Sequence, residues 1–257
     1  MTPKITAIIP TFNEKDNIVE AVKSCQFADE IIVVDSFSTD GTLDLVKDIP
    51  KVRTLSHEYI NSAAQKNWTI PQAKHEWIFL LDADERVDKE LEKEILKTVQ
   101  NPKHSAYWIK RSNYFMDKKL NFVWKGDAVI RLFKKDDCKY EEKHVHAEII
   151  SKGTIGRLPV GELIHDTYKH KGLESHVIKN YRYSTWAAYD RVNKIEKITM
   201  YHLMVKPLFA FFKRYILQGG IFDGRQGFIV SMFGMWSVFL RNVKIWRMHQ
   251  GEKIEAK

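Results

Sequence analysis

Short apolar runs alternate with helical patterns through residues 1–100 of this chain, and this alternation constrains the fold more than any other feature. The apolar runs are candidate strands at 5–10, 30–35, 52–55 and 76–81. The stretches between them predict helices at roughly 15–26, 41–48, 60–73 and 88–100. Strands that alternate with helices are typical of a parallel sheet with crossover helices. We therefore predict an α/β fold that begins with half of a doubly wound sheet.

Each of the four predicted strands ends in polar residues. These are Thr11, Asn13 and Glu14, then Asp35 and Ser36, then Ser56 and His57, and finally Asp82 and Asp84. In sheets of this kind ligands bind outside the carboxyl ends of the strands, so these side chains should share one edge. Four of them are acidic, which disfavours a site for a bare anion. The set favours a metal cation, or the hydroxyl and N–H groups of a ribose and a base.

The fourth strand poses a charge problem, because its apolar run ends in Asp82, Asp84 and Glu85. Carboxylates near a core repel one another and lose hydration, so they need a compensating cation. A hard divalent ion such as Mg²⁺ or Mn²⁺ takes one or two carboxylates and completes its shell with phosphate oxygens. A solvated turn is the alternative. The neighbouring Asp35 and Glu14 favour the metal, with a nucleoside diphosphate as its remaining ligand.

The chain lacks the glycines of a phosphate-binding loop. Gly41 is the only glycine before Gly126, so neither a GxGxxG motif nor a Walker loop can be present. This excludes the dinucleotide-dependent dehydrogenases and the P-loop nucleotidases. A pyrophosphate would have to be neutralised by the metal and by cations such as Lys66 or Arg131.

The remaining residues predict a single cytoplasmic enzyme core. Residues 104–166 contain shorter extended segments with glycine turns, which indicates a mixed continuation of the sheet, and 172–195 is again helical. Cys25 and Cys138 have neither CxxC nor Cys/His spacing, so we interpret them as reduced side chains. The N-terminus enters an apolar strand at once and has no secretion signal, so we expect a cytoplasmic active face.

The C-terminal fifth is different in kind. Residues 199–250 are rich in Phe, Met, Trp and Leu. They contain seven Lys and Arg residues and a single acid, Asp223, so this segment carries +6 of the chain's net charge of +8. The longest uncharged run, 226–240, has 15 residues, short of the roughly 20 that cross a bilayer as a helix. We predict amphipathic helices on an anionic membrane surface. Packing on the catalytic domain or a homo-oligomer interface is the alternative.

These patterns divide the chain into a catalytic domain at 1–198, with a nucleotide-binding half at 1–100 and an acceptor half at 101–198, and a membrane-associating extension at 199–257. Nucleic-acid binding is not expected, because the basic residues are interleaved with aliphatic side chains and no such motif accompanies them.

Four motifs in this order and spacing resemble the nucleotide-binding half of the family 2 glycosyltransferases, which have the GT-A fold: ITAIIPTFNE, IIVVDSFSTDGT, QKNW and WIFLLDADE. The later elements RLFKK, VHAE and LIHDTY and the C-terminal KPLFAFF and GGIFDGRQGF are similar to the lipopolysaccharide-core β-1,4-glucosyltransferase branch. The resemblance implies that the first strand and its neighbour bind the substrate uridine through Pro10, Thr11, Asn13, Glu14 and Asp35. It further implies Asp82 beside the ribose and sugar, Asp84 on the metal and Lys66 on the donor.

The resemblance also implies inverting transfer, in which an acceptor hydroxyl attacks the anomeric carbon as UDP departs. Such a reaction needs a general base but no protein nucleophile. Relatives should carry Val-His-Glu where this chain has Val-His-Ala followed by Glu148. The base is therefore open among Glu148, Glu142 and His146, with Glu148 favoured. His165 either completes the metal shell or is structural, and Arg131 is a candidate for the diphosphate.

These observations predict a metal-dependent inverting glycosyltransferase that moves a hexose from a UDP-sugar to a lipid-linked or surface-glycan acceptor. It would lie peripherally on the inner face of the cytoplasmic membrane. A polyprenyl-phosphate sugar transferase is the alternative with the same fold. A sugar-phosphate nucleotidyltransferase would carry a glycine-rich loop where PTFNEKDN stands. A non-catalytic peripheral membrane module is the remaining alternative.

Overall fold

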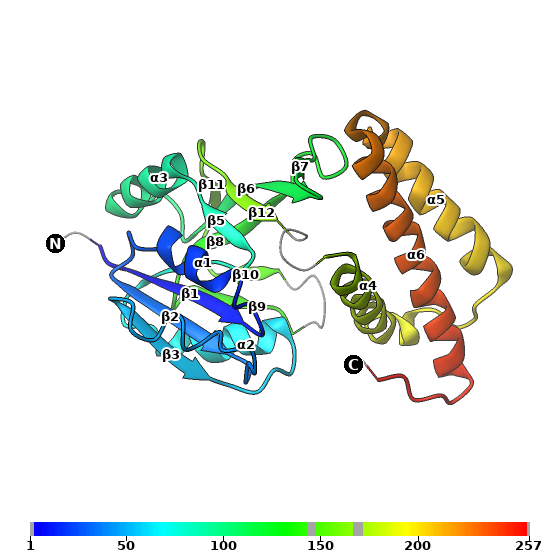
Figure 1. The fold of residues 1–257 in the computed structure, drawn as a ribbon, viewed down its shortest axis with the longest axis horizontal. Coiled ribbons are helices and arrows are strands. Elements are labelled where there is room, and N and C mark those ends of the chain that lie inside the picture. Colours follow the sequence, from blue (N-terminus) through cyan, green and yellow to red (C-terminus); the bar gives the residue numbers. More distant parts are fainter. Residues whose placement is uncertain (1–2, 143–147, 167–171, 256–257) are drawn as a thin grey trace. The chain divides into compact units, whose positions relative to one another are not determined.

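The computed structural model describes residues 3–142, 148–166 and 172–255 and divides into two compact units (Figure 1). The first unit comprises 1–112, 126–142 and 147–166, and the second comprises 113–125, 143–146 and 167–257. The first is a mixed sheet flanked by helices, and the second is mainly helical. The boundary expected at residue 198 stays a prediction.

The sheet begins with four parallel strands. They are β1 (Ile5–Thr11), β2 (Glu30–Asp35), β3 (Val52–Ser56) and β4 (Trp77–Leu80). Their spatial order is β3-β2-β1-β4, as in half of a doubly wound sheet. All four lie where the sequence predicts them.

The sheet continues beyond β4 as the sequence predicts, with antiparallel pairing. The order runs on as β8 (Ala128–Lys134), β6 (Ala106–Phe115), β12 (Leu163–Asp166) and β5 (Glu85–Val87). β11 (Ile155–Arg157) pairs with β6, while β9 (Cys138–Tyr140) and β10 (Ile149–Ser151) form a separate pair. β8 is antiparallel to β4, so the chain reverses beside the strand that carries the acidic motif.

Alternate residues of the central strands fill two hydrophobic layers, because successive side chains of a strand point to opposite faces. One layer contains Ile5, Ala7, Ile9, Ile31, Val33, Trp77 and Phe79. The other contains Ile8, Ile32, Val34, Ile78 and Leu80. Helices α1 (Ile18–Ser24) and α3 (Lys89–Gln100) contribute to the first layer, and α2 (Ser62–Thr69) contributes to the second. The strands are therefore apolar throughout because both faces are covered.

Side-chain caps explain where two of the helices begin. Asn61 Oδ1 accepts the Ala64 N–H at 2.8 Å at the start of α2. Asp88 Oδ1 accepts the Leu91 N–H at 2.6 Å at the start of α3. Both bonds satisfy backbone donors that a helix leaves free in its first turn.

The helix predicted at 41–48 is wrong. The structure forms successive turns there, with the Val46 and Lys47 N–H groups donating to the Leu43 carbonyl, both at 3.1 Å. Pro50 follows closely, and proline disfavours a helical conformation in the residue before it.

The second unit contains three principal helices. They are α4 (Gly172–Tyr189), α5 (Lys206–Phe212) and α6 (Gly224–His249), and β7 (Lys118–Lys119) pairs with the end of β6. Single π-helical segments at Tyr201–Val205 and Lys213–Leu217 extend α5 at both ends without a break. The short 3₁₀ turns of the chain are Ile70–Gln72, Val192–Lys194 and Gly220–Asp223.

One helical stretch of the described chain, Gly220–His249, is long and apolar enough to cross a membrane by length and composition alone. The uncharged run at 226–240 is only its middle part, because the helix continues through Arg241, Lys244 and Arg247. Interfacial binding of this region stays a prediction.

Candidate active site

Side-chain hydrogen bonds brace the two loops that follow β1 and β2. Asn13, at φ +52°, donates its backbone N–H to Ser38 Oγ at 2.7 Å and accepts the Thr39 N–H at 2.9 Å through Oδ1. Asp35 is 1% exposed, and both of its carboxylate oxygens accept hydrogen bonds from Ser38. The structure therefore brings Asn13 and Asp35 together, as predicted from their positions at the ends of parallel strands.

The same bracing shows why this turn is not a backbone phosphate cradle. The N–H of Glu14 donates to Thr42 Oγ1 at 2.9 Å, and the N–H of Lys15 donates to Asp40 Oδ2 at 3.1 Å. These N–H groups are used within the protein, whereas a glycine-rich loop directs free N–H groups at a phosphate. The exclusion drawn from the missing glycines agrees with this geometry.

Pro10 and Thr11 end β1 beside β2, with Thr11 in register with Asp35. The Thr11 side chain is buried, and its hydroxyl has no hydrogen-bond partner among the described residues. A buried hydroxyl without a partner costs free energy, so a ligand that supplies one would be favoured there. Glu14, by contrast, already accepts the Asn17 side-chain amide at 2.9 Å.

Two protein cations compensate the acidic end of β4. Lys66 Nζ, from α2, lies 3.2 Å from Asp82 Oδ1, and Arg131, from β8, binds the other Asp82 oxygen. Burial acts to raise the pKa of Asp82, but Arg131 and Lys66 hold this pKa well below its ordinary value. Lys66 and Arg131 are themselves 6% and 4% exposed, whereas the Asp82 side chain keeps 35% of its surface exposed, so the cations are shielded from water and the carboxylate remains accessible. Their predicted contact with donor phosphates stays a prediction.

Glu85 is the functional residue whose role the sequence left open. It is fully buried, and its Oε1 pairs with Arg131 at 2.9 Å and with Arg111 at 3.4 Å. Its Oε2 accepts the Asp82 N–H at 3.1 Å, which fixes the acidic turn. Arg111 in turn pairs with Asp127 at 2.8 Å. The only sequence signal was Arg131, an arginine among the apolar residues of the predicted extended segment AVIRLFKK, whereas Glu85 stood in the acidic turn after the fourth strand.

Asp84, in the turn before β5, lies close to His165 on β12. His165 on β12 is in antiparallel register with Glu85 on β5, and its Nε2 lies 3.7 Å from Asp84 Oδ2. Both side chains keep a small exposed fraction, at 12% for Asp84 and 14% for His165.

This pair fits a divalent metal whose other ligands come from a substrate. Magnesium and manganese accept carboxylate and imidazole donors and keep open positions for phosphate oxygens. The described residues form no group of three or more side chains that could hold a metal by themselves. A metal bound by Asp84 and His165 would therefore take its remaining ligands from water and from the diphosphate of a substrate.

The candidates for the general base lie next to β9 and β10, far along the sequence from Asp82 and Glu85. Glu142 and Glu148 are exposed, and the Glu141 N–H donates to the Glu148 carbonyl at 3.0 Å. His146 lies outside the described residues. The strand β9 is tied to α2 by two hydrogen bonds between Asn67 and Tyr140, at 2.8 and 3.0 Å. The base candidates therefore follow a strand anchored to the helix that carries Lys66.

Comparison with known proteins identifies the family. The family model described as "Glycosyl transferase family 2" matches residues 6–151, more than half of the chain. This chain is a family 2 glycosyltransferase. It is 28% identical to "Lipopolysaccharide core biosynthesis glycosyltransferase LpsC" of Rhizobium meliloti, with 97% of this chain and 95% of that protein covered. An uncharacterized glycosyltransferase of Rickettsia conorii is 26% identical, over 95% of this chain and 90% of the relative. The predicted family and its lipopolysaccharide-core branch are confirmed.

Solved structures confirm the predicted GT-A fold of this family 2 glycosyltransferase. The crystal structure of residues 1–349 of S. aureus TarS superposes with a TM-score of 0.50 at 15% identity, and covers 98% of this chain and 93% of that one. The TarS 1–349 complex with UDP-GlcNAc gives a TM-score of 0.51 at 13% identity, with the same coverage.

The buried ion cluster should make a large contribution to stability. We expect Glu85→Gln to lower the free energy of unfolding by about 3 kcal/mol, because Arg131 and Arg111 would lose a buried carboxylate. Urea unfolding monitored by circular dichroism measures this change. The control is Asp44→Asn, which breaks a solvent-exposed pair with Lys47 and should leave the free energy of unfolding nearly unchanged. Equal effects of the two variants would contradict the assignment of Glu85.

Proposed function

We propose that this family 2 glycosyltransferase moves a hexose from a UDP-sugar to a lipid-linked or lipopolysaccharide-core acceptor, with a divalent metal and with inversion. The observation that carries the proposal is the pairing of Asp84, in the turn between β4 and β5, with His165 on β12, next to the ion pairs that Asp82 forms with Lys66 and Arg131. The similarity to LpsC supports the acceptor class, and the UDP-GlcNAc complex of TarS supports the donor class. Peripheral attachment to the inner face of the cytoplasmic membrane belongs to the same proposal.

The nucleoside would bind at the braced loops. The free hydroxyl of buried Thr11 and the side chains of Asn13 and Asp35 lie at the carboxyl ends of β1 and β2, where such sheets bind nucleotides. The bonds from Ser38 hold Asp35 in place before the donor arrives. Little conformational entropy would then be lost from these loops on binding.

The diphosphate would meet both the metal and the protein cations. Asp84 and His165 would hold Mg²⁺ or Mn²⁺, which supplies Lewis-acid stabilisation of the leaving UDP. Lys66 and Arg131 keep Asp82 ionised at neutral pH, so that it can accept hydrogen bonds from ribose or sugar hydroxyls. Their positive charge also offsets the charge of the diphosphate.

The acceptor hydroxyl requires a base on the side of the sugar opposite the leaving group. Glu148 or Glu142 would take this proton as the oxygen attacks the anomeric carbon. A single displacement of this kind inverts the anomeric centre and needs no covalent bond to the protein.

The assignment of the metal ligand is tested by Asp84→Asn. We expect the variant to lose transfer and metal-dependent UDP binding, because the carboxylate that holds the cation is gone, while its circular dichroism spectrum stays unchanged. Isothermal titration with UDP, with and without Mn²⁺, measures the binding. Asp44→Asn is the matched control and should bind normally. Full transfer by Asp84→Asn at saturating donor would refute the metal site.

The general base is tested by Glu148→Gln and Glu142→Gln, each of which removes one carboxylate from an exposed position. Loss of the base should lower kcat by about 10² to 10⁴ with donor affinity unchanged. We expect this result for Glu148→Gln and a change within about twofold for Glu142→Gln, since only one base takes the proton. The reverse result would make Glu142 the general base. Normal turnover by both variants would leave His146 as the remaining candidate for the base.

The reaction class is tested by transfer from a panel of radiolabelled UDP-sugars to two acceptors. We expect product with a heptose-containing core acceptor, since the relative LpsC is described as a core biosynthesis enzyme. Product only with undecaprenyl phosphate would instead establish a polyprenyl-phosphate sugar transferase. Release of free pyrophosphate from UTP and a sugar phosphate would indicate a nucleotidyltransferase. The absence of turnover with every donor would favour a non-catalytic module.

A further inference from the structure

One face of the helical run from Met200 to Leu217 is apolar and exposed to solvent. The exposed side chains recur at spacings of three and four residues, which places them on one side of a helix. They are 43% to 64% exposed, and comprise Met200, Tyr201, Met204, Val205, Leu208, Phe209, Phe212, Ile216 and Leu217. We call this set the apolar stripe. At about 1.5 Å per residue it is some 25 Å long. A continuous apolar surface of this length is unusual on a soluble monomer and marks an interaction site.

The opposite face of the same run is fixed against α6, so the orientation of the stripe is determined. Asn242 of α6 donates its side-chain amide to the His202 carbonyl at 2.6 Å. The Arg214 guanidinium lies directly over Gly234, where a Cβ atom would come within 1.8 Å of it. These contacts between α5 with its extensions and α6, which lie side by side in Figure 1, leave the stripe pointing away from α6.

The charges around the stripe are basic. Lys206 and Lys213 lie on the same helical run. The only acid in 199–250, Asp223, is 1% exposed, and its carboxylate accepts three backbone N–H bonds from 121–123 at 2.8 to 3.0 Å. No carboxylate of this segment therefore reaches the surface to offset the lysines.

This combination fits an anionic lipid surface better than a second copy of the chain. Apolar and aromatic side chains enter the boundary between headgroups and acyl chains, while lysines contact the anionic headgroups. Two copies packed stripe to stripe would instead bring Lys206 and Lys213 of each copy towards those of the other. Like charges in a desolvated interface oppose association.

Helix α6 is bound to α4 rather than free to cross a bilayer. Lys244, 4% exposed, donates to the Tyr181 carbonyl and the Ser184 hydroxyl, both at 2.8 Å, and to the Thr185 hydroxyl at 2.7 Å. Because α6 carries α4 with it, a spanning α6 would drag the charged side chains of α4 into hydrocarbon, at a high cost in free energy. The stripe is thus the better lipid contact, with the helix pair parallel to the membrane plane.

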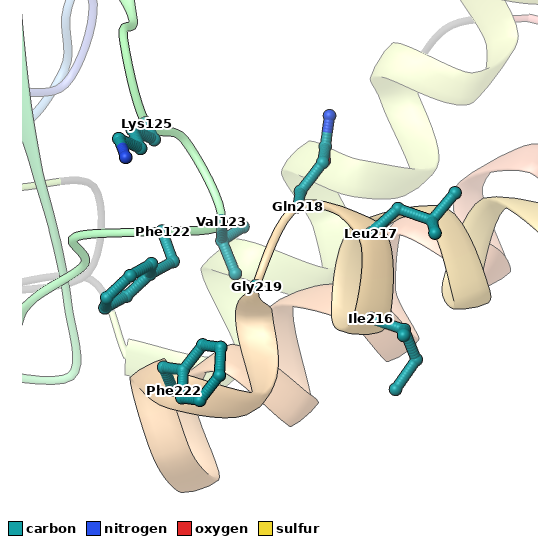
Figure 2. A pocket seen from close by; sticks show the side chains of 8 residues that line it. All are labelled: Phe122, Val123, Lys125, Ile216, Leu217, Gln218, Gly219 and Phe222. Atoms are coloured by element: carbon teal, nitrogen blue, oxygen red, sulfur yellow. The ribbon is translucent and has the colours of Figure 1, made fainter.

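The stripe leads into an open cavity at the turn between α5 and α6. The cavity has a volume of about 390 Å³ and is lined by Phe122, Val123, Lys125, Ile216, Leu217, Gln218, Gly219 and Phe222. Figure 2 shows Phe122 and Phe222 facing each other on one side of the turn, with ring centres 5.3 Å apart, while Ile216 and Leu217 project from the helix. Phe222 is 72% exposed. Phenylalanine is among the side chains that interfacial helices insert at the boundary between headgroups and acyl chains.

We propose that the apolar stripe and the Phe122–Phe222 pair form a surface that docks in the plane of an anionic bilayer. Lys206, Lys213 and Lys125 lie at the headgroups, and α6 serves as the rigid support. The inference rests on the proposed function for its purpose, since a lipid-linked acceptor is presented at such a surface. The binding itself is independent of transfer and is measured without substrate.

The test is sedimentation of the full chain with vesicles of phosphatidylcholine, with and without phosphatidylglycerol. We expect binding to the anionic vesicles, and a loss of at least about tenfold in Leu208→Glu/Phe209→Glu, because two large apolar side chains would no longer enter the lipid. The matched control is Val177→Glu/Ile178→Glu, which adds the same charge at an adjacent exposed pair on α4. We expect the control to bind within about twofold of the unchanged chain, since its α4 pair would lie outside the docking surface. Unchanged circular dichroism spectra and thermal unfolding midpoints show that both variants are folded.

Three outcomes would overturn the docking surface. One is equal loss of vesicle binding in the two double variants. Another is that both double variants stay bound to membranes after an alkaline wash, which would indicate that α6 spans the bilayer. The last is a dimer of the unchanged chain in light scattering that only the stripe variant dissociates, without vesicle binding by either. A failure of the proposed transferase reaction would appear as missing turnover and would leave the vesicle binding intact.

Discussion

The pairing of Arg131 with Asp82 and Glu85 is the interaction on which the acidic site depends. Two carboxylates at the end of an apolar strand would otherwise need water or protonation, because isolated buried charges are strongly unfavourable. Arginine stays charged in essentially any protein environment and offers several donors in one plane, so one side chain can hold both acids. Its own pKa, which burial would lower, is raised well above the ordinary value by Asp82 and Glu85.

The antiparallel pairing of β8 with β4 places Arg131 next to these acids. β8 is antiparallel to β4, and the register pairs Leu132 with Phe79. Arg131, one residue before Leu132, therefore comes to the carboxyl end of β4, where the acids begin. A sheet of parallel strands alone would not return the chain to this edge so directly. The antiparallel second half of the sheet thus supplies the arginine that pairs with the acids at the end of the parallel first half.

The two units handle charge in opposite ways. In the first unit, three cations pair with three carboxylates around the fully buried Glu85: Lys66, Arg111 and Arg131 with Asp82, Glu85 and Asp127. In the second unit, the single carboxylate of 199–250, that of Asp223, accepts hydrogen bonds from backbone N–H groups. The Asp223 carboxylate therefore does not offset the positive charge of Lys206 and Lys213 beside the apolar stripe. The proposed function, which joins a water-soluble nucleotide donor to a lipid-linked acceptor, would use both arrangements.

The sequence by itself determined the four parallel strands, the family and the collection of polar residues at one edge. Strand alternation and short apolar runs are local patterns, and the carboxyl ends of parallel strands must meet. It could not exclude turns at 41–48, because the effect of Pro50 competed with an apparent helical pattern. Only the tertiary structure decided that Glu85 joins Arg131 and Arg111, that His165 faces Asp84, and which side of the Met200–Leu217 run stays exposed. Each of these depends on strand register or helix packing between residues far apart in the chain, which no local pattern encodes.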